Sequence, residues 1–253
     1  MPAIKKEIFD TLSDGQTVSL YTLRNTKGNE LKVTDYGARV VSLRFRNKNF
    51  ENKFMFVGHE SATDYEKDNS NLGIVYVDSD DYLAKKIWNA EQTIEGVKLS
   101  IKDGDKEISV IYSISNDNEV SIIYEGRGIE DITTMIPFNS DVLIDPKFKV
   151  YTENYDGSST GSWAIIDKPA IVEMELGMFG FDIGCPIDWL NSGLKNAADI
   201  VSETADMTIN MYATQNNIQI DSIDGGFTIK TSGTKRDNGV IKAQTVYVFK
   251  NKS

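Results

Sequence analysis

The feature that most constrains the fold is a series of short segments in which apolar and polar residues alternate. Three of them follow one another over residues 97–101, 108–114 and 120–124. The turn signals that bound them are Glu95-Gly96, Asp103-Gly104-Asp105 and Asn116-Asp117-Asn118. A repeat of two residues is that of a β-strand with one buried face, so this region predicts an antiparallel meander with one wet face.

The stretch at residues 21–57 also predicts β-strands joined by turns. It holds strand-type residues in three groups, with turn chemistry at residues 25–29 and 47–49 and a Gly-Ala-Arg triplet at residues 37–39. Further strands are predicted over residues 72–77, 148–151, 170–176, 207–212, 218–223, 227–231 and 245–249. Residues 58–68 predict one helical turn or a loop, residues 126–146 are less regular, and residues 188–199 hold the only credible helix.

Many short strands and few helices predict an all-β sandwich with large twisted antiparallel sheets. With 253 residues the chain is long enough for a substantial core in one domain of this kind. It has no tandem repeat, and its five prolines are scattered. We therefore expect a single domain over residues 1–253.

The charge and the cysteine count exclude several functions. A formal net charge of −11 argues against nucleic acid or an anionic membrane as the main partner, because both favour basic patches. No apolar run is long enough to span a bilayer, and residues 1–7 lack the hydrophobic segment of a secretory signal. One His and one Cys exclude a conventional zinc site, and Asp78, Ser79, Asp80 and Asp81 predict a solvated turn rather than a calcium loop. The lone Cys185 predicts a buried thiol, and with it a reducing, cytoplasmic compartment.

Several stretches, taken in order, resemble the aldose 1-epimerase (galactose mutarotase) family. They are Asp14-Gly15 with residues 18–25, residues 31–40 with Tyr36-Gly37-Ala38-Arg39, residues 56–58 with Asp64-Tyr65, residues 112–124, residues 211–219 and residues 245–249. Between Val77 and Trp88 the chain is shorter than full members, and the segment that carries a His-Gly-Gly loop is absent. The resemblance implies a β-supersandwich, a small-molecule sugar in a groove across one sheet, and no cofactor.

Mutarotation opens and recloses a hemiacetal ring, which needs a base at the anomeric hydroxyl and an acid at the ring oxygen. In the family a glutamate is the base and a histidine after an asparagine is the acid. The resemblance places the asparagine at Asn139, the acid position at Ser140 and the base position near Lys230. Neither of the last two can act in the usual way, because a serine titrates too high and a lysine needs a pKa depressed by several units.

The resemblance leaves one family carboxylate in place. Gly180-Phe181-Asp182 is similar to the motif that supplies a sugar-binding carboxylate, so Asp182 and Asn139 are the expected substrate-binding residues. Asp182 could equally be structural. The family's arginine falls near residues 73–81, where this chain has none.

Other side chains have a structural interpretation that outweighs a functional one. The only histidine, His59, lies away from the family's site positions and predicts a surface residue. Trp88, Trp163 and Trp189 could stack on a sugar, but core packing is the more common use of tryptophan.

Three hypotheses follow. The first is a carbohydrate-binding protein that resembles aldose 1-epimerase but lacks its acid–base pair. The second is an active epimerase in which Asp182 and a rearranged carboxylate, Glu173 or Glu175, replace that pair. The third is a protein that binds something other than a sugar on the same scaffold. The sequence specifies neither the sugar nor the oligomeric state.

Overall fold

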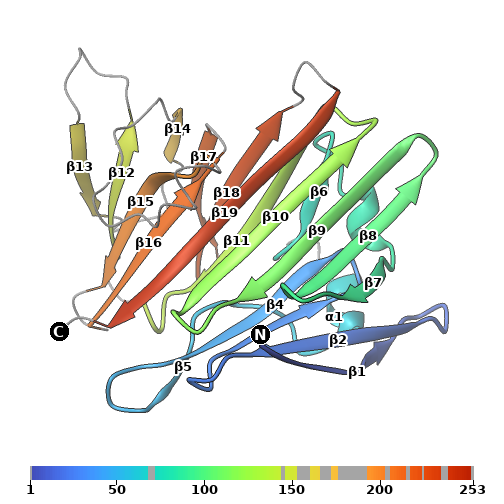
Figure 1. Ribbon diagram of the computed structural model, residues 1–253, viewed down its shortest axis with the longest axis horizontal. Coiled ribbons are helices and arrows are strands. Elements are labelled where there is room, and N and C mark those ends of the chain that lie inside the picture. The colour runs from blue at the N-terminus through green and yellow to red at the C-terminus, as the bar shows by residue number, and fades with distance from the viewer. Residues whose placement is uncertain are drawn as a thin grey trace.

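The computed structural model describes residues 2–67, 72–143, 146–152, 160–165, 172–175, 193–202, 206–214, 217–223, 225–234 and 239–251. These residues form three antiparallel sheets and two short helices, which confirms the predicted all-β sandwich (Figure 1). The helices are α1 (Ala62–Lys67) and the 3₁₀ turn η1 (Tyr82–Lys85). Neither is long or apolar enough to cross a bilayer, and the described residues contain no other helix.

The N-terminal sheet has the order β1-β2-β3-β4-β5, built from β1 (Ala3–Thr11), β2 (Thr17–Arg24), β3 (Glu30–Thr34), β4 (Arg39–Arg46) and β5 (Asn52–Phe54). The large sheet has the order β13-β12-β15-β16-β19-β10-β9-β8-β7. Its strands are β7 (Asn89–Gln92), β8 (Val97–Asp103), β9 (Lys106–Ile114), β10 (Glu119–Arg127), β12 (Lys147–Thr152), β13 (Thr160–Ile165), β15 (Lys195–Ser202), β16 (Met207–Ala213) and β19 (Val240–Asn251). The small sheet has the order β14-β17-β18-β11-β6, built from β6 (Val75–Val77), β11 (Asp131–Asn139), β14 (Val172–Glu175), β17 (Asn217–Ile223) and β18 (Gly226–Thr234).

One hydrophobic cluster joins all three sheets, because it includes Leu43 of β4, Tyr112 of β9 and Phe138 of β11. The large and small sheets face each other across this core, and the ring centroids of Phe138 and Tyr247 lie 5.6 Å apart. A chain of buried hydroxyls crosses the same gap. Its members are Tyr124, Thr134, Thr231 and Thr245, with oxygen–oxygen distances of 2.6, 3.2 and 3.2 Å.

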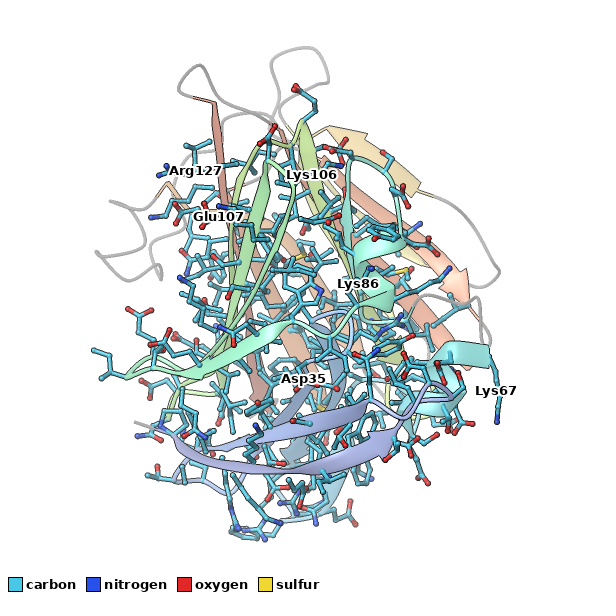
Figure 2. The ribbon with its side chains drawn as sticks, turned by 90° about the vertical axis from the view of Figure 1, so that its right-hand side faces the viewer. Asp35, Lys67, Lys86, Lys106, Glu107 and Arg127 are labelled. Carbon is cyan, nitrogen blue, oxygen red and sulfur yellow. The ribbon has the colours of Figure 1, made fainter. Side chains whose placement is uncertain are left out.

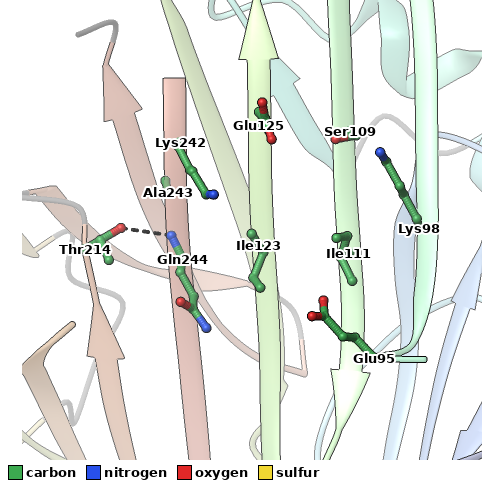
Figure 3. Close-up of a pocket in the computed structure, with 10 residues that line it drawn as sticks. All are labelled: Glu95, Lys98, Ser109, Ile111, Ile123, Glu125, Thr214, Lys242, Ala243 and Gln244. Carbon is green, nitrogen blue, oxygen red and sulfur yellow. Dashed lines mark hydrogen bonds between the residues drawn. The ribbon is translucent and has the colours of Figure 1, made fainter. Parts of the chain in front are cut away.

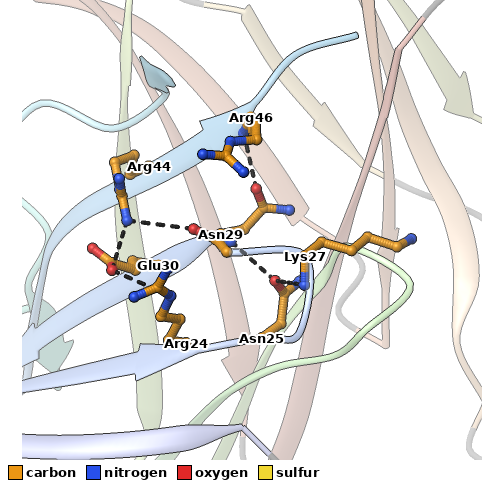
Figure 4. Close-up of polar contacts among 8 residues, drawn as sticks. Arg24, Asn25, Lys27, Asn29, Glu30, Arg44 and Arg46 are labelled. Atoms are coloured by element: carbon orange, nitrogen blue, oxygen red, sulfur yellow. Dashed lines mark hydrogen bonds and ion pairs between the residues drawn. The ribbon is translucent and has the colours of Figure 1, made fainter. Parts of the chain in front are cut away.

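The hairpin between β2 and β3 confirms the turn predicted at residues 25–29. Oδ1 of Asn25 accepts hydrogen bonds from the backbone N–H groups of Lys27 and Asn29, each at 3.0 Å (Figure 4). The side chain of Asn25 also reaches the large sheet, since its Nδ2 donates to the carbonyl of Ser115 at 2.8 Å. Two buried asparagines at this turn, Asn25 and Asn29, therefore fix both the hairpin and its position on the neighbouring sheet.

The Tyr-Gly-Ala-Arg segment is held by the loop that contains η1. Gly37 has φ +70°, and a Cβ on it would lie 2.2 Å from the carbonyl oxygen of Ala84. Arg39 is 1% exposed, donates to that same carbonyl at 3.1 Å, and lies 4.7 Å from the ring of Tyr65 and 5.5 Å from that of Tyr36. The Tyr-Gly-Ala-Arg motif thus serves to pack the β3–β4 connection against the loop that contains η1.

Two local predictions for helices had different outcomes. The helical turn predicted within residues 58–68 is α1, and Ser61 caps it by accepting the N–H of Asp64 at 3.1 Å. The helix predicted over residues 188–199 is wrong where the structure describes it, because β15 (Lys195–Ser202) is a strand between β12 and β16. Ala197 and Ala198 favour a helix in isolation, but pairing on both sides and burial of both residues override that preference.

The region at residues 126–146 contains a nine-residue strand, β11, that the sequence pattern did not predict. Both of its faces are covered between Thr134 and Phe138, so no alternation appears there, and Pro137 disguises it further. Strand β6 is shorter than predicted because a left-handed Gly73, at φ +70°, precedes it. The turn predicted at residues 78–81 is confirmed, with Asp78 and Ser79 at φ 53° and 59°.

Candidate functional site

The candidate site lies on the face of the small sheet that points away from the core. In β11 the side chains of Ile132, Ile136 and Phe138 enter the core cluster, so the alternate positions lie on the opposite face. We call this the distal face. Its described side chains include Tyr76, Thr133, Met135, Asn139, Thr228 and Lys230. The two positions that the resemblance singled out, Asn139 and Lys230, therefore share one face of one sheet.

Asn139 ends β11 and stabilises the turn that follows. Its Nδ2 donates to the carbonyl of Phe54 at 3.1 Å, and its Oδ1 accepts the N–H of Asp141 at 2.9 Å. Ser140 is exposed, and its N–H donates to the carbonyl of Gly225 at 3.0 Å, which ties the turn to the start of β18. The asparagine thus has a structural task in setting where the next side chain, Ser140, is presented.

Lys230 is half-buried in β18, paired through its Cα with Met135 of β11 and with Gln219 of β17. Asn139 pairs with Gly226 of β18. Gly226 and Lys230 are four residues apart on that strand, which is about 13 Å at the rise of a strand. Gln219 in turn pairs with Glu173 of β14. The register therefore places Glu173, Gln219 and Lys230 in one row across the sheet.

Thr228 lies between these positions, two residue pairs closer to Asn139 than Lys230 is. It is fully buried, and its Oγ1 has no hydrogen-bond partner among the described residues. A buried hydroxyl without a partner costs about 1–3 kcal/mol, so its retention calls for an explanation such as a bound polar group. The distal face thus has a buried, unpartnered hydroxyl next to the position of the family's base.

The place of the family's arginine falls on β6 and the turn after it. Tyr76 of β6 pairs with Thr133 on the distal face. The turn is anchored by Asp78, which forms an ion pair with Lys106 at 2.7 Å and accepts the N–H of Glu130 at 2.7 Å. Although partial burial opposes it, these hydrogen bonds lower the pKa of Asp78. No cation that could hold a sugar stands in residues 73–81, and the turn is closed on itself instead.

Several predicted residues lie outside what the structure describes. Asp182, Cys185 and Trp189 fall in residues 176–192, and the side chain of Trp163 is likewise not described. Glu173 and Glu175 are placed only by the backbone register of β14. Their roles stay predictions.

His59 and Trp88 are described, and both pack against other side chains. The ring of His59 lies 4.7 Å from that of Tyr65, and the backbone N–H of His59 donates to the Tyr65 hydroxyl at 2.9 Å. Tyr65 in turn covers the Arg39 guanidinium. Trp88 is 2% exposed and its Nε1 donates to the carbonyl of Leu83 at 2.8 Å, which confirms its prediction as a core residue. Among the described residues no group of acidic residues, His or Cys has the arrangement of a metal site.

The sequence interpretation did not single out a groove on the other sheet. It lies on the outward face of β8, β9, β10 and β19 and has a volume of about 480 Å³ (Figure 3). Its lining residues are Glu95, Lys98, Ser109, Ile111, Ile123, Glu125, Thr214, Lys242, Ala243 and Gln244. The alternation of residues 108–125 predicted this wet face. The charged residues on it, such as Glu125, could have pointed to the groove.

The arrangement of these sheets defines the class of protein: a β-sandwich with the galactose mutarotase-like fold. A GalM/aldose epimerase homologue from C. elegans is 12% identical, with a TM-score of 0.68 and 100% of each chain covered. A galactose 1-epimerase from Lactobacillus acidophilus is 13% identical, with a TM-score of 0.67 and 100% of each chain covered. A galactose mutarotase-like protein from Clostridium acetobutylicum is 10% identical, with a TM-score of 0.65 and 99% of each chain covered.

Solved structures match this chain, but comparisons by sequence find no match. No protein-family model matches the chain, and no curated protein matches it. Identities of 10–13% establish the fold and leave the chemistry to the residues themselves.

Proposed function

We propose that this protein is a cytoplasmic carbohydrate-binding protein on a mutarotase-like scaffold that lacks the acid–base pair of an aldose 1-epimerase. The observation that carries the proposal is the pair of residues at the two family positions. Ser140, in the turn that follows β11, and Lys230, on the neighbouring strand β18, occupy the positions where the family resemblance expects a histidine and a glutamate.

The chemical argument concerns proton transfer to and from the sugar. A hydroxyl at Ser140 is far too weak an acid to protonate a ring oxygen near neutral pH, and its short side chain reaches less far than an imidazole. At the base position the family's glutamate is replaced by Lys230, so the carboxylate that would take the anomeric proton is missing there. The same two groups remain good donors for hydrogen bonds to sugar hydroxyls.

Sugar binding is supported by the composition of the distal face. It combines the Lys230 ammonium and the unpartnered Thr228 hydroxyl on β18 with the half-buried Tyr76 on β6, the two strands that flank β11. Polar groups that converge on a partly buried surface suit a ligand rich in hydroxyls. The expected carboxylate of Asp182 would add an acceptor.

A titration of D-galactose and D-glucose followed by isothermal calorimetry tests binding. We expect a measurable dissociation constant for at least one sugar, weakened about ten-fold by Lys230→Met or Asp182→Ala through loss of a charged hydrogen bond. Lys27→Met, in the exposed hairpin turn, is the matched control and leaves the constant unchanged. Absence of heat with either sugar, together with no thermal shift across a panel of monosaccharides, would favour the third hypothesis, a protein that binds something else.

A second function has one observation in its favour. The backbone register sets Glu173 two strands from Lys230 in the same sheet, which supports Glu173 as the rearranged carboxylate that would form a pair with Asp182. An epimerase that uses this pair would accelerate mutarotation, and Glu173→Gln would abolish the acceleration while leaving sugar affinity nearly intact. Without acceleration by the wild-type protein this alternative fails.

A further inference from the structure

The groove on the large sheet is a separate surface from the distal face of the small sheet. Alternate residues of β9 and β10, such as Val110, Tyr112 and Tyr124, point into the core between the two sheets. The groove is built from the positions between them, including Ser109, Ile111 and Ile123, so it lies on the outward side of the large sheet. Nothing that happens at Asn139 or Lys230 requires this surface to be polar or hollow.

The floor of the groove is apolar and its walls are polar. Ile111 and Ile123 face each other across β9 and β10 as direct Cα partners. Lys98 and Lys242 stand on the two flanking strands, β8 and β19, and extend toward the strands between them (Figure 3). Along β10 the wall continues to Glu125, whose direct partner on β9 is Ser109.

A second hollow of about 400 Å³ extends the groove along the same strands. It shares Lys98, Ser109 and Glu125 with the first and adds the direct Cα partners Glu107 and Arg127. Figure 2 shows these two side chains next to each other, where β9 begins and β10 ends. The two hollows together carry three basic residues and three acidic ones, so the surface has no net charge within a chain of net charge −11.

These opposite charges do not neutralise one another. Glu125 is the direct cross-strand partner of Lys242, and Glu107 that of Arg127, yet within the described residues neither pair comes within the 4.0 Å of an ion pair. Elsewhere such cross-strand pairs do close, as between Glu30 and Arg44 at 2.6 Å. The charged groups of Glu107, Glu125, Arg127 and Lys242 are therefore available to a ligand, whereas Gln244 is already hydrogen-bonded to Thr214 and Ser121.

The balance of charges selects the chemistry of that ligand. An anion would gain from the basic residues and be repelled by as many acidic ones, and a cation the reverse. A neutral molecule rich in hydroxyls can use every group, because hydroxyls donate to carboxylates and accept from ammonium groups. The two isoleucines suit the C–H face of a sugar ring, and the volume lies in the range of ordinary ligand sites. We propose that this groove binds a neutral oligosaccharide of two to three units, independently of the distal face.

The test is a titration of the ¹⁵N-labelled full chain with maltotriose, cellotriose and N,N′,N″-triacetylchitotriose, with trigalacturonate as the acidic comparison. We expect at least one neutral trisaccharide to shift the amide signals of Ile111, Ile123 and Gln244. Glu125→Ala and Lys242→Ala should each weaken that binding roughly ten-fold, through loss of a charged hydrogen bond. The matched control is Lys250→Ala, exposed on the same strand but outside the groove, which leaves the affinity unchanged.

The results separate this site from the distal face. Binding that survives Lys230→Met but falls with Glu125→Ala supports the proposal even if monosaccharides do not bind elsewhere. The proposal is overturned if none of the three neutral trisaccharides moves the groove amides, if trigalacturonate binds more tightly than all of them, or if the groove variants leave the affinity unchanged.

Discussion

Gly37 and Arg39 show how a residue can mark a family's scaffold without taking part in its chemistry. The glycine allows the backbone to meet the carbonyl of Ala84, and the arginine caps that carbonyl from inside the protein. Both side-chain requirements come from one crowded contact between the β3–β4 connection and the loop that contains η1. The motif could be recognised from sequence, but its reason is visible only when residues far apart in the chain are brought together.

Gly37→Ala tests that contact. A Cβ would lie 2.2 Å from the Ala84 oxygen at a φ of +70°, so we expect a loss of more than about 2 kcal/mol in the free energy of unfolding, or no folded protein. Gly104→Ala is the control, because Gly104 has φ +59° but nothing within 4 Å of the added carbon. Its cost should stay near 1 kcal/mol in urea denaturation. If both variants lose the same free energy of unfolding, backbone strain at positive φ explains the loss and the contact with Ala84 does not.

Asp35 gives a prediction with pH. It is 5% exposed, its Oδ1 accepts the N–H of Ser19 at 2.8 Å, and burial raises the pKa of its carboxyl. Between the ordinary carboxyl pKa and the raised one, the folded protein holds a proton that the unfolded chain has lost. Folding stability should therefore fall as the pH rises through that interval.

Asp35→Asn removes this titration and keeps an oxygen for the Ser19 N–H. Its melting temperature relative to the wild type should rise from pH 4 to pH 7, as measured by calorimetry across that range. Asp103→Asn, at an exposed position, should run parallel to the wild type. A constant difference between Asp35→Asn and the wild type would refute the assignment.

At the scale of elements, the turn after β6 anchors one edge of the small sheet. The Asp78 carboxylate links the turn to Lys106 of β9 and to the N–H groups before and at the start of β11. The lowered pKa of Asp78 means that this contribution is present above its ordinary range and is lost as the pH falls through the lowered value. The link joins the small sheet to the large one.

Asp78→Ala should cost about 2 kcal/mol, because the turn loses three hydrogen bonds and a residue that tolerates φ 53°. Asp78→Asn keeps an oxygen for the backbone N–H groups and should cost about half as much. Chemical denaturation at pH 7 measures both. If the asparagine variant is as unstable as the alanine variant, the ion pair with Lys106 is the larger contribution.

The sequence predicted some elements and not others for a physical reason. Strands β8, β9 and β10 have one buried and one wet face, so alternation revealed them. Strand β11 is covered on both faces and contains Pro137, so it left no periodic signal although it carries Asn139. At β15, alanines suggested a helix, and only the pairing with β12 and β16 decides against it.

On the scale of the whole molecule, the pairing of distant strands could not be read from the sequence. Strand β19, the last described one, lies between β16 and β10 (Figure 1), and β6 pairs with β11 although more than fifty residues separate them. Long-range pairings of this kind have no local signature. The candidate site depended on the same pairing, because β11 and β18 bring Asn139 and Lys230 onto one face only once the small sheet has formed.

The single domain proposed for residues 1–253 predicts one cooperative unfolding transition. The core cluster draws on all three sheets, so loss of one sheet exposes the others. Near-UV and far-UV circular dichroism should therefore give the same midpoint in urea. Two separate transitions would divide the chain into independent units.

The central claim is that the scaffold binds sugar but has lost mutarotation, and polarimetry of freshly dissolved α-D-galactose and α-D-glucose tests it most directly. Wild-type protein should leave the rate of the optical-rotation change at that of buffer alone. The double variant Ser140→His/Lys230→Glu, which restores the two family groups after β11 and on β18, should raise the rate. A substantial rate with the wild-type protein, abolished by Asp182→Ala, would contradict the account.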